Sequence, residues 1–289
     1  MKTIIIGSEG FIGKRLTRFL EGQGVDVQGF SSSVPGSIDP GTGILSDDFT
    51  IPHGTGAVVY LAQSPYCHRV PEMSSHIINV NVVSAVRMVE LARRANVKRF
   101  IYTSTGSVYQ SSFESLSETA PLRRDDWYVL SKVHAEEALS LYRNAMDITV
   151  TRLFGIYGPG QTGKMIPKLL NSLLQGGDIY IEKNPLDASD MNGLKVSLCY
   201  IGDVVRILAE LLLRNGPDYL NIAGKEAVSV RQIAASMARH LGKEPKFKLL
   251  DRCRHFDLIA DITLLEKILS PAFTPFETGL GNTAEAALK

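Results

Sequence analysis

Short apolar runs and longer amphipathic segments alternate along the first half of the chain. Two long stretches, 76–95 and 126–143, repeat their apolar residues with a helical period, and a shorter helical segment follows residue 11. Between them lie apolar runs with the length of buried parallel strands, at residues 3–7, 25–30, 57–62, 99–105 and 147–158. This alternation predicts an α/β fold with a doubly wound parallel sheet.

The pattern loosens after residue 158. It predicts helices over 165–177 and 228–242, the second starting at Ser229 and ending at Gly242, and a strand that leads into a helix over 194–213. Residues 31–56 are rich in Ser, Pro and Gly and predict loops around a short strand near Ile44. We therefore expect a Rossmann-type sheet with a smaller C-terminal α/β substrate lobe. The dinucleotide-binding domain would comprise 1–153 and about 196–223, and the lobe 154–195 and 224–289.

Composition excludes several classes of protein. A 289-residue chain that is 44% hydrophobic can bury a sizeable core, and its net charge of +1 gives no reason to expect nucleic acid or a membrane surface as a partner. The short basic clusters are interpreted as solvated surface: Lys98-Arg99, Arg123-Arg124, and Arg252 with Arg254.

Cysteine and histidine spacing gives no metal or disulfide pattern. The three cysteines lack a C-x-x-C spacing, and the six histidines lack metal-ligand spacing, so we expect no metal. No apolar run approaches the ~20 residues of a membrane span, and the first apolar run is too short for a signal peptide. A soluble, cytoplasmic protein is the prediction.

Three glycines follow the first predicted strand, in the sequence GSEGFIG. Gly7 would permit the tight turn, Gly10 the approach of a pyrophosphate, and Gly13 close packing of the next helix, whose N-terminus favours an anion. The second strand ends in Ser31 and Ser32, where an acid would bind the ribose of NAD. Serine tolerates a 2′-phosphate, but no Arg or Lys lies between 31 and 50. NADP is therefore favoured over NAD, and both stay open.

Tyr128 and Lys132 are four residues apart on a predicted helix, so they share one face. A tyrosine acts as acid or base at neutral pH only if its pKa is lowered, and a fixed cation favours the phenolate. The pair follows the strand that ends in Thr105, whose side chain would lie at the carboxyl edge of the sheet. The arrangement predicts proton transfer next to a dinucleotide.

The stretch YGPGQTGKM resembles a phosphate-binding loop of nucleotide triphosphatases. Gly158, Gly163 and Lys164 match the pattern, but the Mg²⁺-binding Ser or Thr is replaced by Met165. A phosphotransferase is therefore not expected.

The order and spacing of several motifs resemble the extended short-chain dehydrogenase/reductases, the NAD-dependent epimerase/dehydratase family that mostly acts on nucleotide sugars. The motifs are GSEGFIG, VVYLAQ, NVNVVSAVRMVELARRANVKRFIYTSTGSVY, YVLSK, RLFGIYGPGQ, CYIGDVV and LNIAG. The resemblance covers essentially the whole chain. It implies a homodimer, through helices at 77–94 and 129–143, and a sugar substrate that is nucleotide-linked.

The resemblance also implies roles for individual residues. Tyr128 would be the acid/base, Lys132 would hold the nicotinamide ribose and lower the tyrosine's pKa, and Thr105 would hydrogen-bond the reacting oxygen. The residues expected to bind the cofactor are Gly7, Gly10, Phe11, Ile12, Gly13, Ser31, Ser32, Asp47 or Asp48, Leu61, Ala62, Gln63, Asn81, Thr103, Tyr128, Lys132 and Phe154.

The substrate side departs from the family pattern. The usual asparagine is replaced by Gly155 and the usual arginine by Val196, while Lys164 could supply a phosphate contact. Three activities remain open: an epimerase, an NADPH-dependent keto-sugar reductase, and a dehydratase, the last disfavoured because the residues after Thr105 are not acidic. A non-catalytic dinucleotide sensor on the same fold is a further alternative, which the presence of both Tyr128 and Lys132 disfavours.

Overall fold

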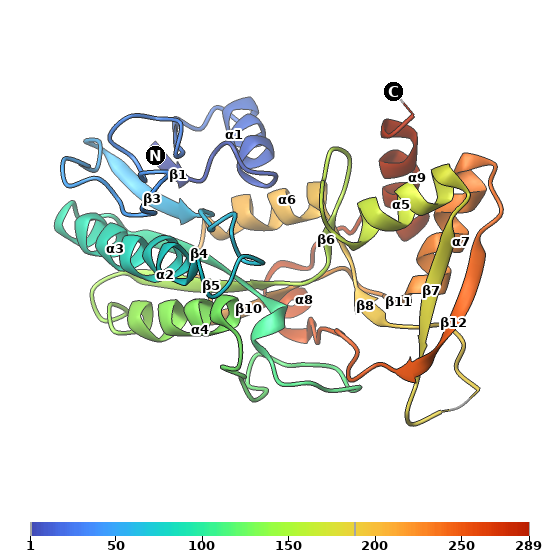
Figure 1. Cartoon of the computed structure of the whole chain (residues 1–289). Coiled ribbons are helices and arrows are strands. Elements are labelled where there is room, and N and C mark those ends of the chain that lie inside the picture. The colour runs from blue at the N-terminus through green and yellow to red at the C-terminus, as the bar shows by residue number, and fades with distance from the viewer. Residues whose placement is uncertain (1, 188, 289) are drawn as a thin grey trace. The chain divides into compact units, whose positions relative to one another are not determined.

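The chain folds into two compact units, seen in a computed structural model that describes residues 2–187 and 189–288 (Figure 1). The first unit comprises Met1–Gln110, Pro121–Arg152 and Val205–Leu220, and the second Ser111–Ala120, Leu153–Val204 and Asn221–Lys289. Both units are therefore assembled from separate stretches of the sequence.

The first unit is built on a six-stranded sheet with the order β10-β5-β4-β3-β1-β2. The strands are β1 (Lys2–Ile6), β2 (Val27–Phe30), β3 (Thr55–Tyr60), β4 (Arg99–Thr105), β5 (Asp147–Leu153) and β10 (Tyr219–Ile222). β1 pairs in parallel with β2 and β3, and β3 with β4. Strand order reverses beside β1, which is where parallel sheets of this kind bind ligands. The predicted parallel sheet is confirmed.

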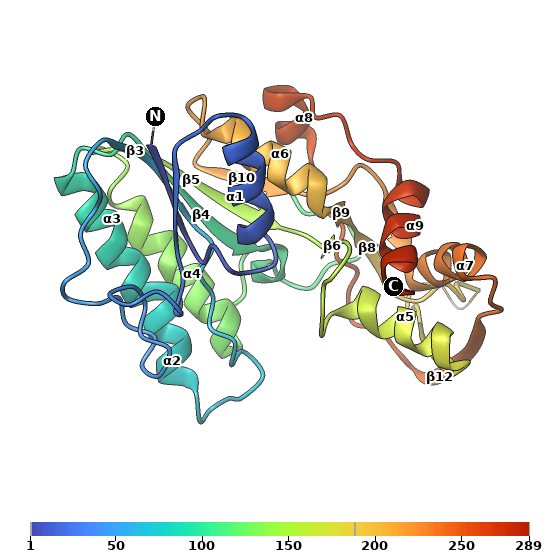
Figure 2. The same ribbon diagram turned by 90° about the horizontal axis from the view of Figure 1, so that it is seen from above.

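Helices cover both faces of this sheet. Figures 1 and 2 show α3 (Ser84–Arg94) and α4 (Trp127–Ser140) on one face and α1 (Gly13–Gly22) on the other, with α6 (Ile201–Leu211). Ile4, Val58 and Phe100 of the sheet pack with Met88 and Leu139 of the helices, all fully buried. The apolar runs form strands because both of their faces are covered.

The helix predicted over 76–95 is not continuous. It consists of α2 (Ser74–Ile78), a π-helical turn (Asn79–Val83) and α3. Asn81, inside the turn, donates from Nδ2 to Ser131 Oγ (2.8 Å) of α4 and accepts from the Ser64 N–H (3.4 Å). A wide turn of this kind commonly marks a functional site. Apolar periodicity cannot reveal it, because α- and π-helical turns bury nearly the same positions.

The strand predicted over 147–158 is also interrupted. β5 ends at Leu153, and the chain resumes as β6 (Ile156–Tyr157), which pairs with β9 (Cys199–Tyr200) in the second unit. Gly155 lies between them with φ +46°, and a Cβ there would overlap the Ser197 carbonyl oxygen. The prediction of one continuous strand is wrong because the left-handed glycine turns the chain.

The second unit has its own core, under α5 (Met165–Gln175), α7 (Val230–Leu241) and α9 (Phe276–Ala286). Ser229 and Gln232 form a capping box at the start of α7, and Gly242 follows it with φ +61°, so both predicted boundary signals are confirmed. The remaining elements are η2 (Gly106–Val108), β7 (Asp178–Lys183), β8 (Lys195–Ser197), β11 (Ala227–Ser229), β12 (Lys246–Cys253) and α8 (Thr263–Leu269), with β7 paired to β12 and β8 to β11.

In residues 2–187 and 189–288, none of the helices combines the length and the apolar character needed to cross a lipid bilayer.

Candidate active site

The glycine-rich turn joins β1 to α1 and lies against the end of β3. Gly7 has φ +89°, and a Cβ at this position would lie 2.8 Å from the Ala62 backbone nitrogen. A Cβ at Gly13 would overlap the Gly7 carbonyl oxygen, whereas Gly10 is exposed on the outer side of the turn. Two of the glycines are therefore needed for the turn itself, and the third leaves its outer surface open.

The turn also presents hydrogen-bond donors. The Lys14 N–H donates to the Gly10 carbonyl and the Leu16 N–H to that of Ile12, but the N–H groups of Phe11, Ile12 and Gly13 donate to no other described residue. Ile12 is the N-cap of α1 and provides no side-chain acceptor. Unpaired N–H groups at a helix N-terminus fit a pyrophosphate. The residues present therefore fit a dinucleotide.

The end of β2 carries no carboxylate. Ser31 is buried, and its Oγ lies 2.7 Å from Ser33 Oγ, while Ser32 is exposed. Asp47, expected to contact the adenine, is exposed and forms an ion pair with Arg87 of α3. A ribose or its phosphate at this strand end would meet hydroxyl groups rather than an acid.

The loop after β3 reaches from the glycine turn to α4. The Leu61 N–H donates to the Ile6 carbonyl (2.8 Å) at the end of β1, and Ala62 lies against Gly7. Gln63 Oε1 accepts a hydrogen bond from the Tyr128 hydroxyl (3.2 Å). Gln63 is among the residues expected to bind the cofactor, and the sequence did not predict its contact with the phenol.

Tyr128 lies in the first turn of α4. Asp126 is the N-cap of the helix and accepts from the Val129 N–H (2.8 Å), which fixes the turn that carries the phenol. Thr105 ends β4, and its side chain forms a hydrogen bond with the Tyr128 hydroxyl. The structure thus brings together the two residues proposed to contact a reacting oxygen.

The pKa of Tyr128 does not follow the sequence prediction. Burial raises it well above the ordinary value of a tyrosine, and the hydrogen bond with Thr105 opposes the rise only in part. Desolvation of the phenolate is thus the main influence on this group, and the role of Lys132 in lowering its pKa stays a prediction.

Lys132 is buried beneath the site, with 2% of its surface exposed. Its Nζ donates to the Thr103 carbonyl (2.9 Å) and lies 4.8 Å from the ring centroid of Tyr102. Burial lowers its pKa to about 7, and the negative charge of Glu136 opposes that decrease. The Thr103 hydroxyl donates to the Tyr60 carbonyl (3.0 Å), so β3, β4 and α4 are linked beneath the site.

Four predicted site residues belong to the second unit: Phe154, Gly155, Lys164 and Val196. Phe154 is fully buried, and its N–H donates to the Ile222 carbonyl (2.9 Å). Val196 lies in the core of the unit, and Lys164 is an exposed residue at the start of α5. Gly155 has no room for a side chain, so it can present only its backbone.

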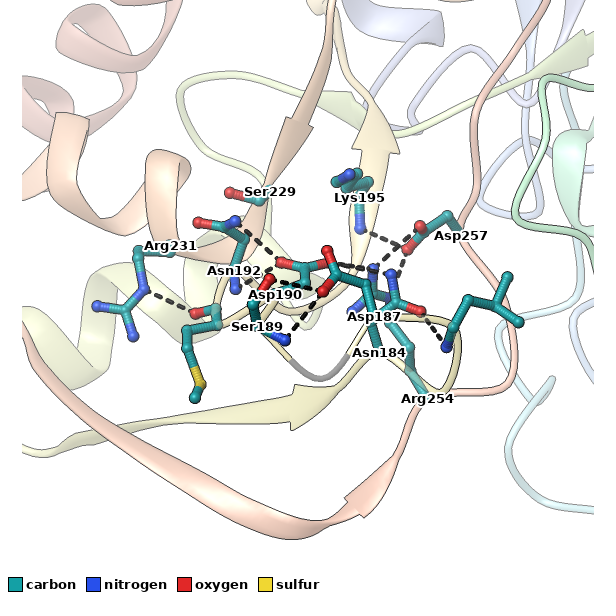
Figure 3. A network of polar contacts seen from close by, with 12 residues as sticks. Asn184, Asp187, Ser189, Asp190, Asn192, Lys195, Ser229, Arg231, Arg254 and Asp257 are labelled. Atoms are coloured by element: carbon teal, nitrogen blue, oxygen red, sulfur yellow. Dashed lines mark hydrogen bonds and ion pairs between the residues drawn. The ribbon is translucent and has the colours of Figure 1, made fainter.

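Arg254 was interpreted from the sequence as surface, and this is wrong. Figure 3 shows it between two carboxylates of the second unit: its Nε donates to Asp257 (2.8 Å) and its Nη2 to Asp190 (2.9 Å). Its side chain is 2% exposed, and its buried Nη1 has no hydrogen-bond partner among the described residues. Burial opposes ionisation of Asp190, but the hydrogen bonds from Arg254, Asn192 and Asn184 together outweigh it and hold the pKa of Asp190 well below its usual range.

Sequence reasoning missed this cluster because one of its carboxylates is distant in sequence. Asp257, three residues after Arg254, was the available signal, whereas Asp190 is brought to Arg254 only by folding. Asn192 and Asn184 donate to Asp190 as well (2.9 Å and 3.2 Å), so the loop before β8 is organised around this ion pair (Figure 3).

Within residues 2–187 and 189–288, no three His, Cys, Asp or Glu side chains are grouped so that they could hold a metal ion.

Comparison with known proteins gives a consistent result. The sequence model of the NAD dependent epimerase/dehydratase family matches residues 3–223. A dTDP-4-dehydro-6-deoxy-D-allose reductase from a Streptomyces species is 24% identical, over 97% of this chain and 94% of that protein. A UDP-glucuronate 4-epimerase from Thermodesulfobacterium geofontis is 26% identical, over 75% of this chain and 68% of that protein.

A solved structure shares the fold over the full length. MoeE5 in complex with UDP-glucuronic acid and NAD is 22% identical, with a TM-score of 0.81, and the match covers 100% of this chain and 99% of that one. The doubly wound sheet with a second α/β unit is therefore the architecture of a known group of dinucleotide-binding proteins.

Proposed function

Because this chain belongs to the NAD dependent epimerase/dehydratase family, we propose that it is an extended short-chain dehydrogenase/reductase in which Tyr128 moves a proton to or from a sugar hydroxyl. One observation carries the assignment of roles: the Tyr128 hydroxyl is hydrogen-bonded to Thr105, and Lys132 is buried one helical turn further along α4. The glycine turn is in the same unit of the chain.

Each of these residues has a distinct task. Thr105 holds the reacting oxygen beside the phenol, Tyr128 accepts its proton during oxidation and returns it during reduction, and Lys132 stabilises the phenolate and holds ribose hydroxyls. When bound, the nicotinamide accepts or supplies the hydride. The positive charge of Lys132 and of an oxidised nicotinamide both favour the phenolate, which offsets the effect of burial on Tyr128.

The cofactor is a nicotinamide dinucleotide, with NADP proposed over NAD. The serines at the end of β2 support NADP, because no carboxylate is present there to repel a 2′-phosphate. The similar structure of MoeE5 was solved with NAD. Thermal unfolding with each cofactor at equal concentration tests the preference: NADP⁺ should give the larger increase in melting temperature, and a larger increase with NAD⁺ would reverse the assignment.

The substrate class follows from the relatives, whose names specify UDP- and dTDP-linked sugars. We propose a nucleotide-linked sugar, with interconversion at a hydroxyl-bearing carbon as the reaction. A keto-sugar reductase is the second candidate, and the full-length similarity to the dTDP-keto-sugar reductase favours it.

The finer predictions on assembly and location are retained as proposals. A homodimer would use the helices at 77–94 and 129–143, at or beside which apolar side chains are exposed: Val83 in the π-helical turn, Trp127 at the start of α4 and Leu141 just after its end, the last 82% exposed. Sedimentation of the wild-type protein should give the mass of two chains, and sedimentation of Leu141→Asp should give a mass closer to that of a single chain. The protein is proposed to act in the cytoplasm.

The decisive experiment combines substrate and variant. The purified protein is incubated with a panel of UDP- and dTDP-linked hexoses and their keto forms, and the products are identified by NMR. Tyr128→Phe should reduce turnover by about 10²-fold or more without weakening cofactor binding, whereas Tyr180→Phe, an exposed tyrosine on β7, should change neither. Undiminished turnover by Tyr128→Phe would refute the role of Tyr128.

Cofactor retention separates the two candidate activities. An epimerase restores its cofactor in every cycle, so NAD(P)⁺ should be released from the purified protein on denaturation. A reductase consumes NADPH stoichiometrically, so loss of reduced-cofactor absorbance on adding a keto-sugar supports that reading and contradicts the epimerase.

A further inference from the structure

A buried carboxylate continues the line of catalytic side chains along α4. Tyr128, Lys132 and Glu136 are spaced by four residues and lie along one face of the helix. Lys132 and Glu136 are only 2% and 1% exposed. Neither charge is therefore screened by bulk water, and each depends on its protein neighbours.

Glu136 is held from two strands. Arg152 at the end of β5 donates to it through Nη2 (2.7 Å) and Nε (3.2 Å), and the Ser104 hydroxyl of β4 donates to Oε1. The side chain accepts these bonds and donates none, which is the behaviour of a carboxylate. Along β4, Ser104 stands between two residues that contact the other side chains of this row. The Thr103 carbonyl accepts a hydrogen bond from Lys132, and the Thr105 side chain is hydrogen-bonded to Tyr128.

Arg152 is anchored on its far side. Its Nη1 donates to the Tyr109 hydroxyl (3.0 Å), and its guanidinium lies over the rings of Tyr109 (4.9 Å) and Tyr219 (4.5 Å). Glu136 thus forms an ion pair with a permanent cation, and it is four residues from Lys132 on the same helix, whose pKa its negative charge raises.

In the described part of the chain, the other groups in contact with the Lys132 ammonium carry no negative charge. They are the Tyr102 ring and the Thr103 carbonyl, both from β4. Tyr60 of β3 stacks on Tyr102, and burial raises the pKa of both phenols, so they stay neutral. Within this set, Glu136 is the anion.

We propose that Glu136 is a positioning residue for the reaction, which keeps Lys132 charged in the buried site and fixes its turn of α4 against β4. The consequence for turnover rests on the proposed function, whereas the effect on Lys132 does not. Without Glu136, Lys132 would lose its proton at a lower pH, and a neutral amine neither stabilises a phenolate nor donates three hydrogen bonds.

The charge of Lys132 can be measured directly. With ¹³C-labelled lysine, the Cε resonance of Lys132 is identified by its absence in Lys132→Met and followed against pH by NMR. In Glu136→Gln its titration midpoint should fall by about one pH unit or more, and the pH above which turnover declines should fall with it. An unchanged midpoint in a folded Glu136→Gln protein would overturn the proposal.

Three variants separate charge from structure. Ser104→Ala removes a hydrogen bond but no charge, so the midpoint should hardly move. Arg152→Met should raise the midpoint. Glu136→Gln combined with Arg152→Met removes both charges, and its midpoint should still lie below the wild-type value, because the negative charge that acts on Lys132 is absent. This double variant leaves no unpaired ion, so it serves if Glu136→Gln alone does not fold.

The measurements also distinguish failure of the positioning role of Glu136 from failure of the proposed function. Lower turnover in Glu136→Gln with an unmoved Lys132 midpoint would mean that Glu136 is merely structural, and the proposal would fail. If the wild-type protein turns over none of the sugars tested, the NMR titration still decides the proposal, and only the proposed function is in question.

Discussion

At the scale of single residues, burial acts in the same way on Tyr128 and Lys132, the two side chains that we propose to be catalytic. It disfavours the charged form of each, raising the pKa of Tyr128 and lowering that of Lys132 to about 7. Catalysis needs both charged forms in the oxidative direction. The site is therefore a place where stability and function oppose each other, and removing the lysine should make this visible.

We predict that Lys132→Met stabilises the fold at low pH and less so at high pH. Below about pH 7 Lys132 is protonated in both states, and the wild-type fold bears the full cost of burying the cation. Between about pH 7 and pH 10, Lys132 is protonated in the unfolded chain but not in the folded one, so the free energy of unfolding of the wild type rises with pH. Urea unfolding should show Lys132→Met more stable by about 1–3 kcal/mol at pH 6, with a smaller difference at pH 9.5.

Lys164→Met is the matched control, because Lys164 is exposed. Its stability difference from the wild type should not depend on pH. A pH-independent difference for Lys132→Met as well would show that Lys132 does not change its protonation on folding in this range.

Gly155 offers a second test at the scale of single residues, with Gly163 as the matched control position. Both have positive φ, +46° and +69°, but a Cβ at Gly155 would overlap the Ser197 carbonyl oxygen, whereas Gly163 has open space around it. Gly163→Ala should cost about 1 kcal/mol, from backbone strain alone. Gly155→Ala should cost about 3 kcal/mol or more, because the backbone of β8 must move. Equal losses of unfolding free energy in the two variants, measured with denaturant, would show that the backbone of β8 can move at little cost.

At the scale of elements, the first turn of α4 determines where the reactive phenol lies. Tyr128 is only two residues beyond the N-cap, so it has few helical hydrogen bonds behind it. Asp126 supplies the missing acceptor through its bond to the Val129 N–H. The position of the catalytic group thus depends on a local cap.

We predict that Asp126→Ala lowers both stability, by about 1 kcal/mol, and turnover. Asp126→Asn keeps a capping oxygen but removes the negative charge that contributes to the raised pKa of Tyr128. It should leave stability almost unchanged and shift the activity profile to lower pH. If Asn and Ala destabilise equally in thermal unfolding, the cap is not the source of the effect.

Elements with strong local signals could be predicted from the sequence, and the exceptions have a physical cause. The capping box at Ser229 is encoded within four residues, and the β1–α1 turn within seven. The π-helical turn around Asn81 depends on partners 17 and 50 residues away, and the break at Gly155 on a strand 40 residues later. Such long-range contacts leave no periodic trace in the sequence.

The same distinction applies to the candidate site. The positions of Tyr128, Lys132 and Thr105 follow from strand and helix order, which the sequence could supply. The charge states do not, because they depend on burial and on Glu136 and Arg152, which interact across α4 and β5. Arg254 was misread for a similar reason, since only folding brings Asp190 to it.

At the scale of the whole molecule, the predicted cofactor residues are unevenly distributed. Phe154 is in the second unit, and the glycine turn, the loop after β3 and the catalytic helix are all in the first. Cofactor binding should therefore stabilise the first unit most directly. Hydrogen exchange with and without NADP⁺ should show protection at β1, α1 and the start of α4, and little change at β7 and β12.

Gly10 allows the cofactor site to be tested by mutation, because a Cβ is less strongly opposed there than at Gly7 or Gly13. A Cβ there would lie 3.2 Å from the Gly7 carbonyl oxygen and would occupy the surface that a pyrophosphate approaches. Gly10→Ala should weaken cofactor binding by about tenfold or more, a loss of about 1.4 kcal/mol, with almost unchanged stability in the absence of cofactor. Gly22→Ala, which adds a Cβ into open space at the end of α1, should leave the affinity unchanged and should not lower stability, because alanine favours a helix over glycine. Calorimetric titration measures the affinities, and equal affinities of Gly10→Ala and the wild type would place the pyrophosphate away from this turn.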